Sequence, residues 1–387
     1  MNDSTSFALY VHLPFCARKC PYCAFASSEL HSPRQADETV AALKQEGSFY
    51  SSQPPWAGNP VHSLFLGGGT PSMLSGSQIV ELVESLRNTF TVQSDAEVTI
   101  EVNPGTVTTE KMSGWRDAGI NRISLGVQSL DLDTLGTLGR IHTAEQARTA
   151  FRRMRDYPFE QVSVDLMYGV VAPDPFEGWK RTLEEVIEWH PDHISAYSLI
   201  VEEGTQFERM QRQGIAVKCT EEEELAQYEL TRNLLEQAGY QHYEVSNWAL
   251  PGHACRHNIS YWDGRSYLAL GPSGHSYDAV RHRRFWNHGE TQRWLQAVAK
   301  VGIGEEAGEL LTAEQIFEER LMLGLRMVAG VEEKFLEAVA GEAGVEWPPT
   351  VLRDLIKRNL IEREDGILRY TKSGILIADE IEAILTS

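Results

Sequence analysis

This sequence lacks three features that would assign its class at once. No apolar run approaches the length of about 18 residues that a membrane-spanning helix needs. The first residues, MNDSTSF, have neither the basic start nor the apolar stretch of a secretory signal. Positive charge is scarce, because 35 Lys and Arg stand against 55 Asp and Glu, a net charge of −20. We therefore expect no transmembrane segment, no export signal and no non-specific binding to nucleic acid or anionic membranes.

Cysteine is also rare, with five residues in the chain of 387. The number is odd, and Cys16, Cys20 and Cys23 fall within eight residues of one another. A secreted disulfide framework would spread its cysteines and pair them. The pattern instead predicts a reducing compartment, the cytoplasm, and a bound metal or cluster. Cys219 is expected to be a structural thiol.

The first 200 residues alternate short apolar runs with helical patterns. The apolar runs lie at 7–13, 61–67, 96–103, 121–128, 161–169 and 193–200, and the helical patterns at 33–53, 76–90, 108–118, 143–157 and 176–189. Alternating strands and helices predict parallel βαβ units. Six units in about 200 residues predict an α/β fold with a partial (β/α)6 barrel, because a closed eight-unit barrel typically needs about 250 residues. Ligands then bind at the carboxyl ends of the strands.

The pattern changes after residue 200. Residues 221–239 predict an amphipathic helix whose acidic first turn we interpret as a solvated face. The stretch 240–290 is rich in aromatic residues, His and Gly, and its periodicity is weak. The end of the chain shows helical patterns at 314–328, 332–344 and 351–360, followed by two strand-like arms around Asp365-Gly366. We predict a partial barrel over 1–205, a connecting α+β region over 206–300 and a helical, winged-helix-like domain over 301–387.

The three clustered cysteines have the spacing C-x3-C-x2-C. Three thiolates on one loop are suited to a cubane [4Fe–4S] cluster, which ordinarily takes four. The fourth iron is then left open to a small molecule. Zinc is the competing interpretation, although the spacing is unusual for zinc and no suitable His or Cys follows at once. Three unrelated structural cysteines are the remaining alternative.

This spacing resembles that of the radical S-adenosylmethionine (SAM) superfamily. The resemblance implies that SAM chelates the open iron and is cleaved to a 5′-deoxyadenosyl radical. Gly68, Gly69 and Thr70 resemble the glycine motif that contacts SAM in that superfamily. Further candidates are Tyr10 on the first strand, Tyr22 beside Cys23, and four residues at the ends of later strands or units, namely Glu101, Gln128, Arg140 and Asp165. A guanidinium such as Arg140 can pair with a carboxylate as a fork. For each of these residues the alternative is a purely structural polar or core-packing role.

The resemblance narrows to the branch related to oxygen-independent coproporphyrinogen III oxidase. Its motifs are matched by HLPFCARKCPYCAF, LGGGTPS, EVNPGT, NRISLGVQS, LGRIH, VDLMYG and YEVSNWA. That branch contains a decarboxylating oxidase and heme chaperones. The oxidase has a fourth cysteine two positions after the third, where this chain has Phe25, and a longer region before the triplet. Both departures favour the chaperones.

The sequence His257-Asn258-Ile259-Ser260-Tyr261-Trp262 matches the H-N-x-x-Y-W motif of the heme-chaperone branch. An imidazole can ligate heme iron, and Tyr and Trp offer flat apolar area with a polar edge. The alternative for His257 is an ordinary loop residue. Other candidate ligands are Cys255, His253, His275, His282 and His288. Arg281, Arg283 and Arg284 are candidates to pair with propionates, with a solvated basic turn as the favoured interpretation.

These patterns predict a heme-binding trafficking protein that binds heme, a [4Fe–4S] cluster and SAM and passes heme to an acceptor protein. An electron donor such as a flavodoxin or ferredoxin and a homodimer are further expected partners. The alternative is the oxidase or another radical enzyme acting on a tetrapyrrole. A nucleic-acid regulator is disfavoured, because the expected wing carries Glu362, Glu364 and Asp365, which repel phosphates.

Overall fold

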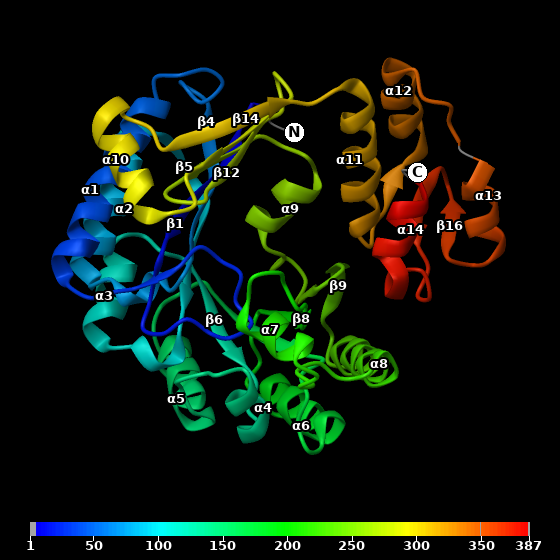
Figure 1. Ribbon diagram of the computed structural model, residues 1–387, viewed down its shortest axis with the longest axis horizontal. Coiled ribbons are helices and arrows are strands. Elements are labelled where there is room, and N and C mark those ends of the chain that lie inside the picture. The colour runs from blue at the N-terminus through cyan, green and yellow to red at the C-terminus, as the bar shows by residue number, and fades with distance from the viewer. Residues whose placement is uncertain (1–4, 349, 386–387) are drawn as a thin grey trace.

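A computed structural model describes residues 5–348 and 350–385 (Figure 1). Within them, one large mixed sheet has the strand order β14-β13-β12-β11-β1-β4-β5-β6-β7-β8-β10-β9. Strands β1 and β4 to β8 run parallel, and β11 joins β1 in parallel; the two outer edges are antiparallel. The six central strands are β1 (Phe7–Leu13), β4 (Pro60–Gly68), β5 (Thr91–Val102), β6 (Arg122–Gln128), β7 (Gln161–Tyr168) and β8 (His193–Ser198).

Helices connect these strands and lie along the outer side of the sheet (Figure 1). They are α1 (Pro33–Tyr50), α2 (Gly76–Thr89), α3 (Thr109–Asp117), α4 (Leu132–Thr137), α5 (Ala144–Arg155) and α6 (Pro175–Glu188). Local signals start them: Ser75 and Thr143 each form a capping box at the first turn of α2 and α5. Six strand–helix units in an open sheet confirm the predicted partial barrel. The short α4 was not predicted.

The strands are buried on both faces, as a parallel sheet covered by helices requires. Leu9, Val11 and Leu13 of β1 are fully buried, and so are Leu64 and Leu66 of β4. Alternate side chains of a strand point to opposite sides of the sheet. One set of side chains therefore packs under the helices, and the other faces the interior of the partial barrel.

The stretch with weak periodicity extends the same sheet. Residues 206–310, which include this stretch, form α7 (Gln206–Arg212), α8 (Glu221–Gln237), β9 (Gln241–Glu244), β10 (Asn247–Ala249), α9 (Arg256–Trp262), β11 (Tyr267–Leu270), β12 (His275–Asp278), β13 (Arg283–Asn287), α10 (Thr291–Val301) and β14 (Glu305–Leu310). Because β11 pairs with β1 and β10 with β8, the sheet continues past residue 205. The three predicted domain ranges therefore stay a prediction.

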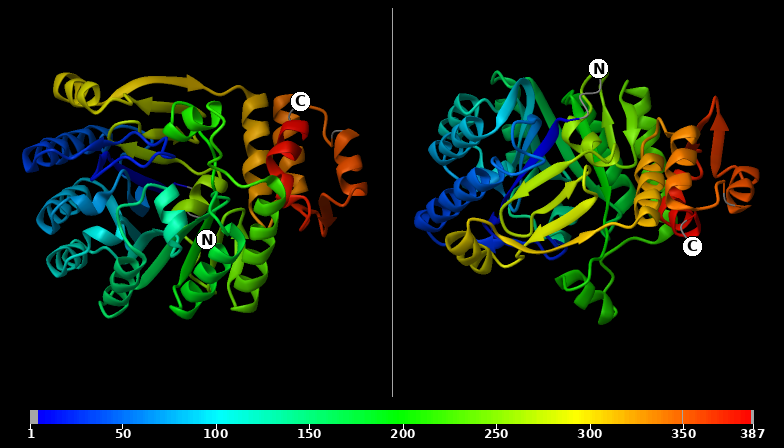
Figure 2. Two further views of the ribbon diagram at one scale, coloured as in Figure 1. Left: turned by 60° about the horizontal axis from the view of Figure 1, so that its bottom comes forward. Right: turned by 90° about the horizontal axis from the view of Figure 1, so that it is seen from above.

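The end of the chain forms a module with its own core and a three-stranded sheet, β15-β17-β16. Its elements are α11 (Ala313–Arg326), β15 (Val331–Glu332), α12 (Glu333–Ala343), α13 (Thr350–Lys357), β16 (Ile361–Glu364), β17 (Ile367–Tyr370) and α14 (Ala378–Leu385). This order is that of the predicted winged helix, although the helix expected over 351–360 ends at Lys357. The module lies to one side of the large sheet in both views of Figure 2.

Helix α11 holds the module against the large sheet next to α9. Arg320 Nη1 donates to the carbonyl of Asp263 at 2.8 Å, and the Arg326 guanidinium lies 5.6 Å from the Trp262 ring centroid. Backbone hydrogen bonds join Val245 to Arg326. Separately, no helix among residues 5–348 and 350–385 is long and apolar enough to span a bilayer.

Candidate functional site

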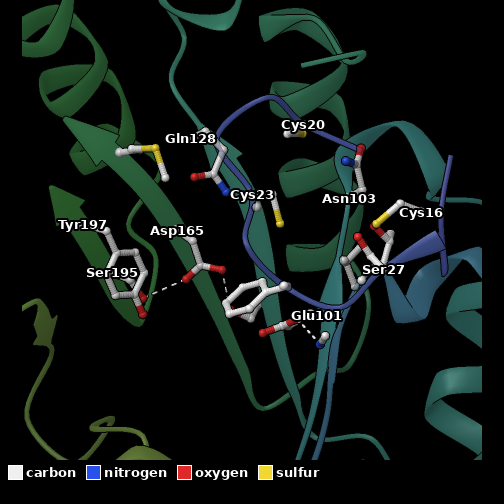
Figure 3. Close-up of a pocket in the computed structure, with 18 of the residues that line it drawn as sticks. Cys16, Cys20, Cys23, Ser27, Glu101, Asn103, Gln128, Asp165, Ser195 and Tyr197 are labelled. Atoms are coloured by element: carbon white, nitrogen blue, oxygen red, sulfur yellow. Dashed lines mark hydrogen bonds between the residues drawn. The ribbon is translucent and has the colours of Figure 1, made fainter. Parts of the chain in front are cut away.

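A cavity of about 600 Å³ opens at the carboxyl ends of the central strands. This volume is within the range of about 300–1,000 Å³ typical of small-molecule sites. The residues predicted to bind the cluster and SAM all line it, and so do His257, Asn258, Tyr261 and Cys255 among the heme candidates. The remaining heme candidates lie outside the lining, namely Trp262, His253, His275, His282, His288, Arg281, Arg283 and Arg284. Side chains from β1, β4, β5, β6, β7, β8 and α9 thus line one cavity. Figure 3 shows those of Glu101, Gln128, Asp165 and Ser195 from β5 to β8 together with the three cysteines.

The cysteine loop arches over the strand ends (Figure 3). It begins at the short β2 (Phe15–Cys16), which pairs in parallel with β3 (Ser28–Glu29) and so closes the loop at its base. The Cys23 amide donates to the carbonyl of Cys20 at 3.1 Å, which makes a tight turn between these two residues. All three cysteines are free thiols and half-buried. Burial raises the pKa of Cys16 and Cys23.

Two polar groups from other elements approach the cysteine sulfurs. Thr70 Oγ1, just after β4, lies 3.6 Å from Cys16 Sγ and can donate to it. Arg140 Nη1 lies 3.7 Å from Cys20 Sγ, and its Nη2 donates to the carbonyl of Gly126 at 3.0 Å. Arg140 Nε is buried without a hydrogen-bond partner in the described part of the chain. A hydroxyl and a cation are thus already aimed at two sulfurs.

Among residues 5–348 and 350–385, no three His, Cys, Asp or Glu side chains are grouped as ligands of one metal ion. A cubane cluster does not require such convergence, because each cysteine binds its own iron. The cysteine sulfurs therefore need only face a common space, and the cavity provides that space.

The glycine motif provides backbone where side chains would not fit. Gly68 has φ of 109°, in the left-handed region, and a Cβ there would lie 2.6 Å from the His12 ring. A Cβ on Gly69 would lie 2.7 Å from the carbonyl oxygen of Phe15. The Gly68 amide donates to Glu101 Oε2 at 3.1 Å. The motif thus packs the end of β4 closely against the start of the cysteine loop and orients Glu101.

Two buried carboxyl groups line the cavity, Glu101 on β5 and Asp165 on β7, with β6 between them. Asp165 accepts hydrogen bonds from Ser124 at 2.6 Å and Ser195 at 2.7 Å (Figure 3). Burial, with a smaller contribution from the negative charge of Asp165, raises the pKa of Glu101 to about 8. Burial also raises the pKa of Asp165. A carboxyl oxygen at either position can accept a hydrogen bond from a hydroxyl group of a ligand, and a cationic ligand group nearby would favour the ionised form.

Gln128 ends β6 with φ of 64°, a conformation that costs a non-glycine residue roughly 1–2 kcal/mol. A register shift between Gly126 and Gln128 marks the same place in the β6–β7 pairing. The bulge turns the Gln128 amide toward the cavity (Figure 3). Backbone strain of this kind is often found at ligand sites.

The two predicted tyrosines are held in different ways. Tyr10 hydrogen-bonds with His12 Nδ1 at 3.1 Å. Tyr22 packs against Phe207, with ring centroids 6.1 Å apart, in a small apolar cluster beneath the cysteine loop. Both rings touch the cavity, so a packing role and a ligand role are compatible.

His257 lies at the first turn of α9 with 2% of its surface exposed. Both ring nitrogens are engaged: Nδ1 with Ser63 Oγ and Nε2 with Tyr261 OH, each at 3.0 Å. The ring stacks on Phe65 at 4.9 Å, and burial lowers its pKa to about 3. The imidazole is therefore neutral, and binding iron through it requires breaking one of these hydrogen bonds. Asn258 and Tyr261 line the cavity beside it.

The other candidates of this region are dispersed. Trp262 lies outside the cavity against Arg326, and Cys255 is buried with Sγ 3.4 Å from Glu97 Oε1. The arginines proposed to meet propionates each pair with a carboxylate: Arg281 with Asp278, Arg283 with Glu305 and Arg284 with Glu319. Only Arg281 is an exposed turn residue, because Arg283 and Arg284 lie half-buried on β13 and not in the solvated basic turn favoured above.

Several cavity residues were not assigned a role from the sequence. They include Asn103, Arg122, Ser124, His193, Ser195 and Tyr197. Each lies on or directly after a predicted strand, so the alternation of the strand is the signal that could have found them. To use this alternation, one must know which face of each strand points into the cavity, and the sequence alone does not give that information.

Comparison with known proteins identifies the family to which this chain belongs. Residues 10–174 match the radical SAM superfamily, and residues 311–377 match the HemN C-terminal domain. The heme chaperone HemW of Bacillus subtilis is 32% identical over 374 residues, covering 96% of this chain and 97% of the relative. The chain belongs to the HemW heme chaperone family. The HemW of Escherichia coli is 37% identical over 311 residues, covering 76% of this chain and 79% of the relative. The resemblance read from the motifs is confirmed.

The solved structure of coproporphyrinogen III oxidase (HemN) from Escherichia coli matches with a TM-score of 0.84. The match covers 99% of this chain and 90% of that one at 24% identity. This chain and the oxidase thus share one fold, and the C-terminal module is part of the similarity. The match to the oxidase concerns the fold alone.

Proposed function

We propose that this chain is a heme chaperone: it binds heme and passes it to an acceptor protein, and it carries a [4Fe–4S] cluster and SAM. The observation that carries the proposal is the match to HemW chaperones over nearly the whole chain. The cavity lined by the cysteine loop and by the residues of the H-N-x-x-Y-W motif supports it.

The residues present fit the cluster and SAM. Cys16, Cys20 and Cys23 are free thiols facing one cavity, and they would hold three irons. With the cluster bound, its open iron would give SAM a binding position and a source of one electron. Thr70 and Arg140 would donate to the sulfurs and so stabilise thiolate charge.

The remaining cavity residues are proposed to hold SAM itself. Glu101 and Asp165 offer acceptors for hydroxyl and ammonium groups, and Gln128 offers an amide at the end of β6. The unpartnered Nε of Arg140 is available to a carboxylate. Tyr10, Tyr22, Gly68 and Gly69 shape the walls and keep the ligand close to the backbone. These roles follow the positions of the side chains around one cavity.

Heme is the cargo in this proposal. His257, Asn258, Tyr261 and Trp262 are proposed to take part in holding it. Both ring nitrogens of His257 already have hydrogen-bond partners, so α9 or Tyr261 must move before the imidazole can bind iron. An acceptor protein, an electron donor such as a flavodoxin or ferredoxin, and a homodimer are proposed partners. The free cysteines agree with the cytoplasm as the proposed location.

The alternative function is decarboxylation of coproporphyrinogen III, supported by the shared fold. Ala24 and Phe25 follow Cys23 where the oxidase branch has its fourth cysteine, and this departure favours the chaperone. The discriminating assay incubates reconstituted protein with coproporphyrinogen III, SAM and reductant without oxygen. The chaperone proposal expects no protoporphyrinogen, and product at enzymatic rates would refute it.

The direct test of the proposed function is a hemin titration of the protein with and without its cluster. We expect a saturable shift of the Soret band with near 1:1 stoichiometry, and transfer of the heme to apo-acceptors. The absence of saturable binding in both forms would reject the chaperone function.

A further inference from the structure

The mouth of the cavity carries large apolar side chains that are exposed to solvent. Phe25 is 65% exposed, Ile200 62%, Ile141 50% and Tyr197 38%. All four line the cavity. Single exposed apolar residues are common on proteins, but several gathered around one cavity mark a site where something binds. These four residues are called the apolar rim below.

The apolar rim is built from Tyr197 at the end of β8 and from three loops that are tied together, those of Phe25, Ile141 and Ile200. Arg18 Nη2 donates to the carbonyl of Gly139 at 2.6 Å, which joins the cysteine loop to the loop of Ile141. The Phe207 amide donates to the carbonyl of Pro21 at 3.0 Å, which joins the cysteine loop to α7. Leu199 is buried in the small apolar cluster with Phe207, so the chain beside Ile200 is anchored. The exposed apolar side chains of the rim therefore stand on loops that hydrogen bonds and packing hold in place.

Charge at the apolar rim is distributed unevenly. Arg18 and Lys19 are exposed on the cysteine loop and line the cavity. Their side chains donate only to carbonyl groups, those of Gly139 and Phe25, and neither forms an ion pair within the described residues. The loop after β8 instead carries the exposed Glu202. On a chain of net charge −20, two uncompensated cations at one edge of an apolar opening favour an anionic group there.

We propose that the apolar rim is the docking site where heme first meets the protein. The porphyrin face covers Phe25, Ile141 and Ile200, and the propionates point to Arg18 and Lys19 and away from Glu202. A flat apolar ligand with two carboxylates on one edge matches this arrangement of surface and charge. This inference rests on the proposed function and specifies where that function begins.

The position of His257 supports a separate docking step. Its ring is buried, and both of its nitrogens are bound to the protein, whereas the apolar rim is open. Phe25 adds a further reason, since it occupies the position of the missing fourth cysteine and presents an aromatic ring at the cavity mouth. Heme thus contacts the exposed rim before the buried imidazole becomes available.

The first test removes the apolar surface away from the cysteines. The double variant Ile141→Ser with Ile200→Ser is compared with a matched control, Val280→Ser with Leu310→Ser, whose residues are 76% and 71% exposed and lie outside the cavity. We expect the hemin Kd of the rim variant to rise about tenfold or more, while the control stays at the wild-type value. Equal Kd values for rim variant and wild type would overturn the inference.

The second test addresses the propionates. Wild-type protein should bind hemin more tightly than hemin dimethyl ester, and Arg18→Gln with Lys19→Gln should lose most of this preference. Iron and sulfide content are measured in parallel, because both residues lie next to cluster cysteines. A preference that survives in a variant with an intact cluster would contradict the proposed orientation.

The outcomes separate this inference from the proposed function. If wild-type protein binds no hemin, the chaperone function itself fails. If wild-type and rim variants bind hemin equally and His257→Ala does not, the function stands and the docking site is wrong.

Discussion

Arg140 Nη1 lies 3.7 Å from the sulfur of Cys20, although 120 residues separate them in the chain. The contact joins the loop after α4 to the cysteine loop. The same guanidinium donates to the Gly126 carbonyl and leaves Nε buried without a partner among the described residues. One side chain therefore touches the proposed cluster ligand, the end of β6 and the space assigned to SAM.

This relationship predicts the effect of changing Arg140. In Arg140→Gln the cation beside Cys20 is lost, and we expect the SAM Kd to rise about tenfold or more, while iron content falls less. Arg140→Lys should be intermediate, because it keeps the charge and loses the fork. Calorimetric titration of the reconstituted protein with SAM measures the Kd of both variants. Arg148→Gln, which removes a surface pair with Glu185, is the control; an Arg140→Gln protein that binds SAM like this control would refute the role.

The hydrogen bond between His257 and Tyr261 gives a second prediction. Tyr261→Phe frees His257 Nε2, so a histidine that ligates heme should then bind hemin more tightly and shift the Soret band further. His257→Ala should weaken the binding. If Tyr261→Phe and His257→Ala weaken hemin binding alike, the pair acts as a structural unit and the imidazole is not the ligand.

Folding must be checked for these variants, since His257 is packed as a core residue. Its ring stacks on Phe65, and its two ring nitrogens hydrogen-bond with Ser63 and Tyr261. We expect His257→Ala to lower the free energy of unfolding by about 2–4 kcal/mol. Urea unfolding measures this loss. A change below about 0.5 kcal/mol would contradict the described packing.

Buried Glu46 on α1 gives a prediction for pH. Its carboxyl accepts hydrogen bonds from the amides of Gly271 and Gly304 and from the side chains of Trp294 and Asn287. Burial raises its pKa from 4.5 to about 7 in spite of these donors. Between these pH values the folded protein keeps a proton that the unfolded chain has released, so the free energy of unfolding falls as pH rises.

The expected loss attributable to Glu46 is about 3 kcal/mol between pH 4.5 and 7, and little more above that range. Glu46→Gln cannot titrate and should lose this part of the pH dependence, although it is less stable at pH 5 because an amide replaces one acceptor. The free energy of unfolding in urea is measured at several pH values for wild type and variant. The difference between the two proteins at each pH removes the contribution of all other titrating groups. If the free energies of unfolding of wild type and Glu46→Gln change with pH in parallel, Glu46 does not titrate in this range and the prediction is wrong.

The sequence predicted the barrel well because its strands are long and separated by helices with clear caps. The run 7–13 is β1, and 121–128 differs from β6 by one residue. Residues 240–290 were harder to interpret, because strands of three to five residues are too short to show a period. Their position depends on partners far along the chain, as β11 depends on β1.

The candidate site shows the same division. Cysteine spacing and the glycine motif are local in sequence, and the structure brings them to one cavity. Trp262 belongs to the same motif as His257, yet the turn of α9 directs it to α11 and Arg326. Arg122 and His193 begin β6 and β8 and line the cavity, although nothing in their local sequence marks them. Local patterns thus predicted the candidate ligands, and the three-dimensional arrangement shows which side chains lie around them.

The measurement that tests the central claim most directly is the iron and sulfide content after anaerobic reconstitution. We expect about four irons and four sulfides per chain for wild type and for Cys219→Ala with Cys255→Ala, and none for the variant in which Cys16, Cys20 and Cys23 are all Ala. An intact cluster in the triple variant, or bound zinc in place of iron in the wild type, would contradict the account.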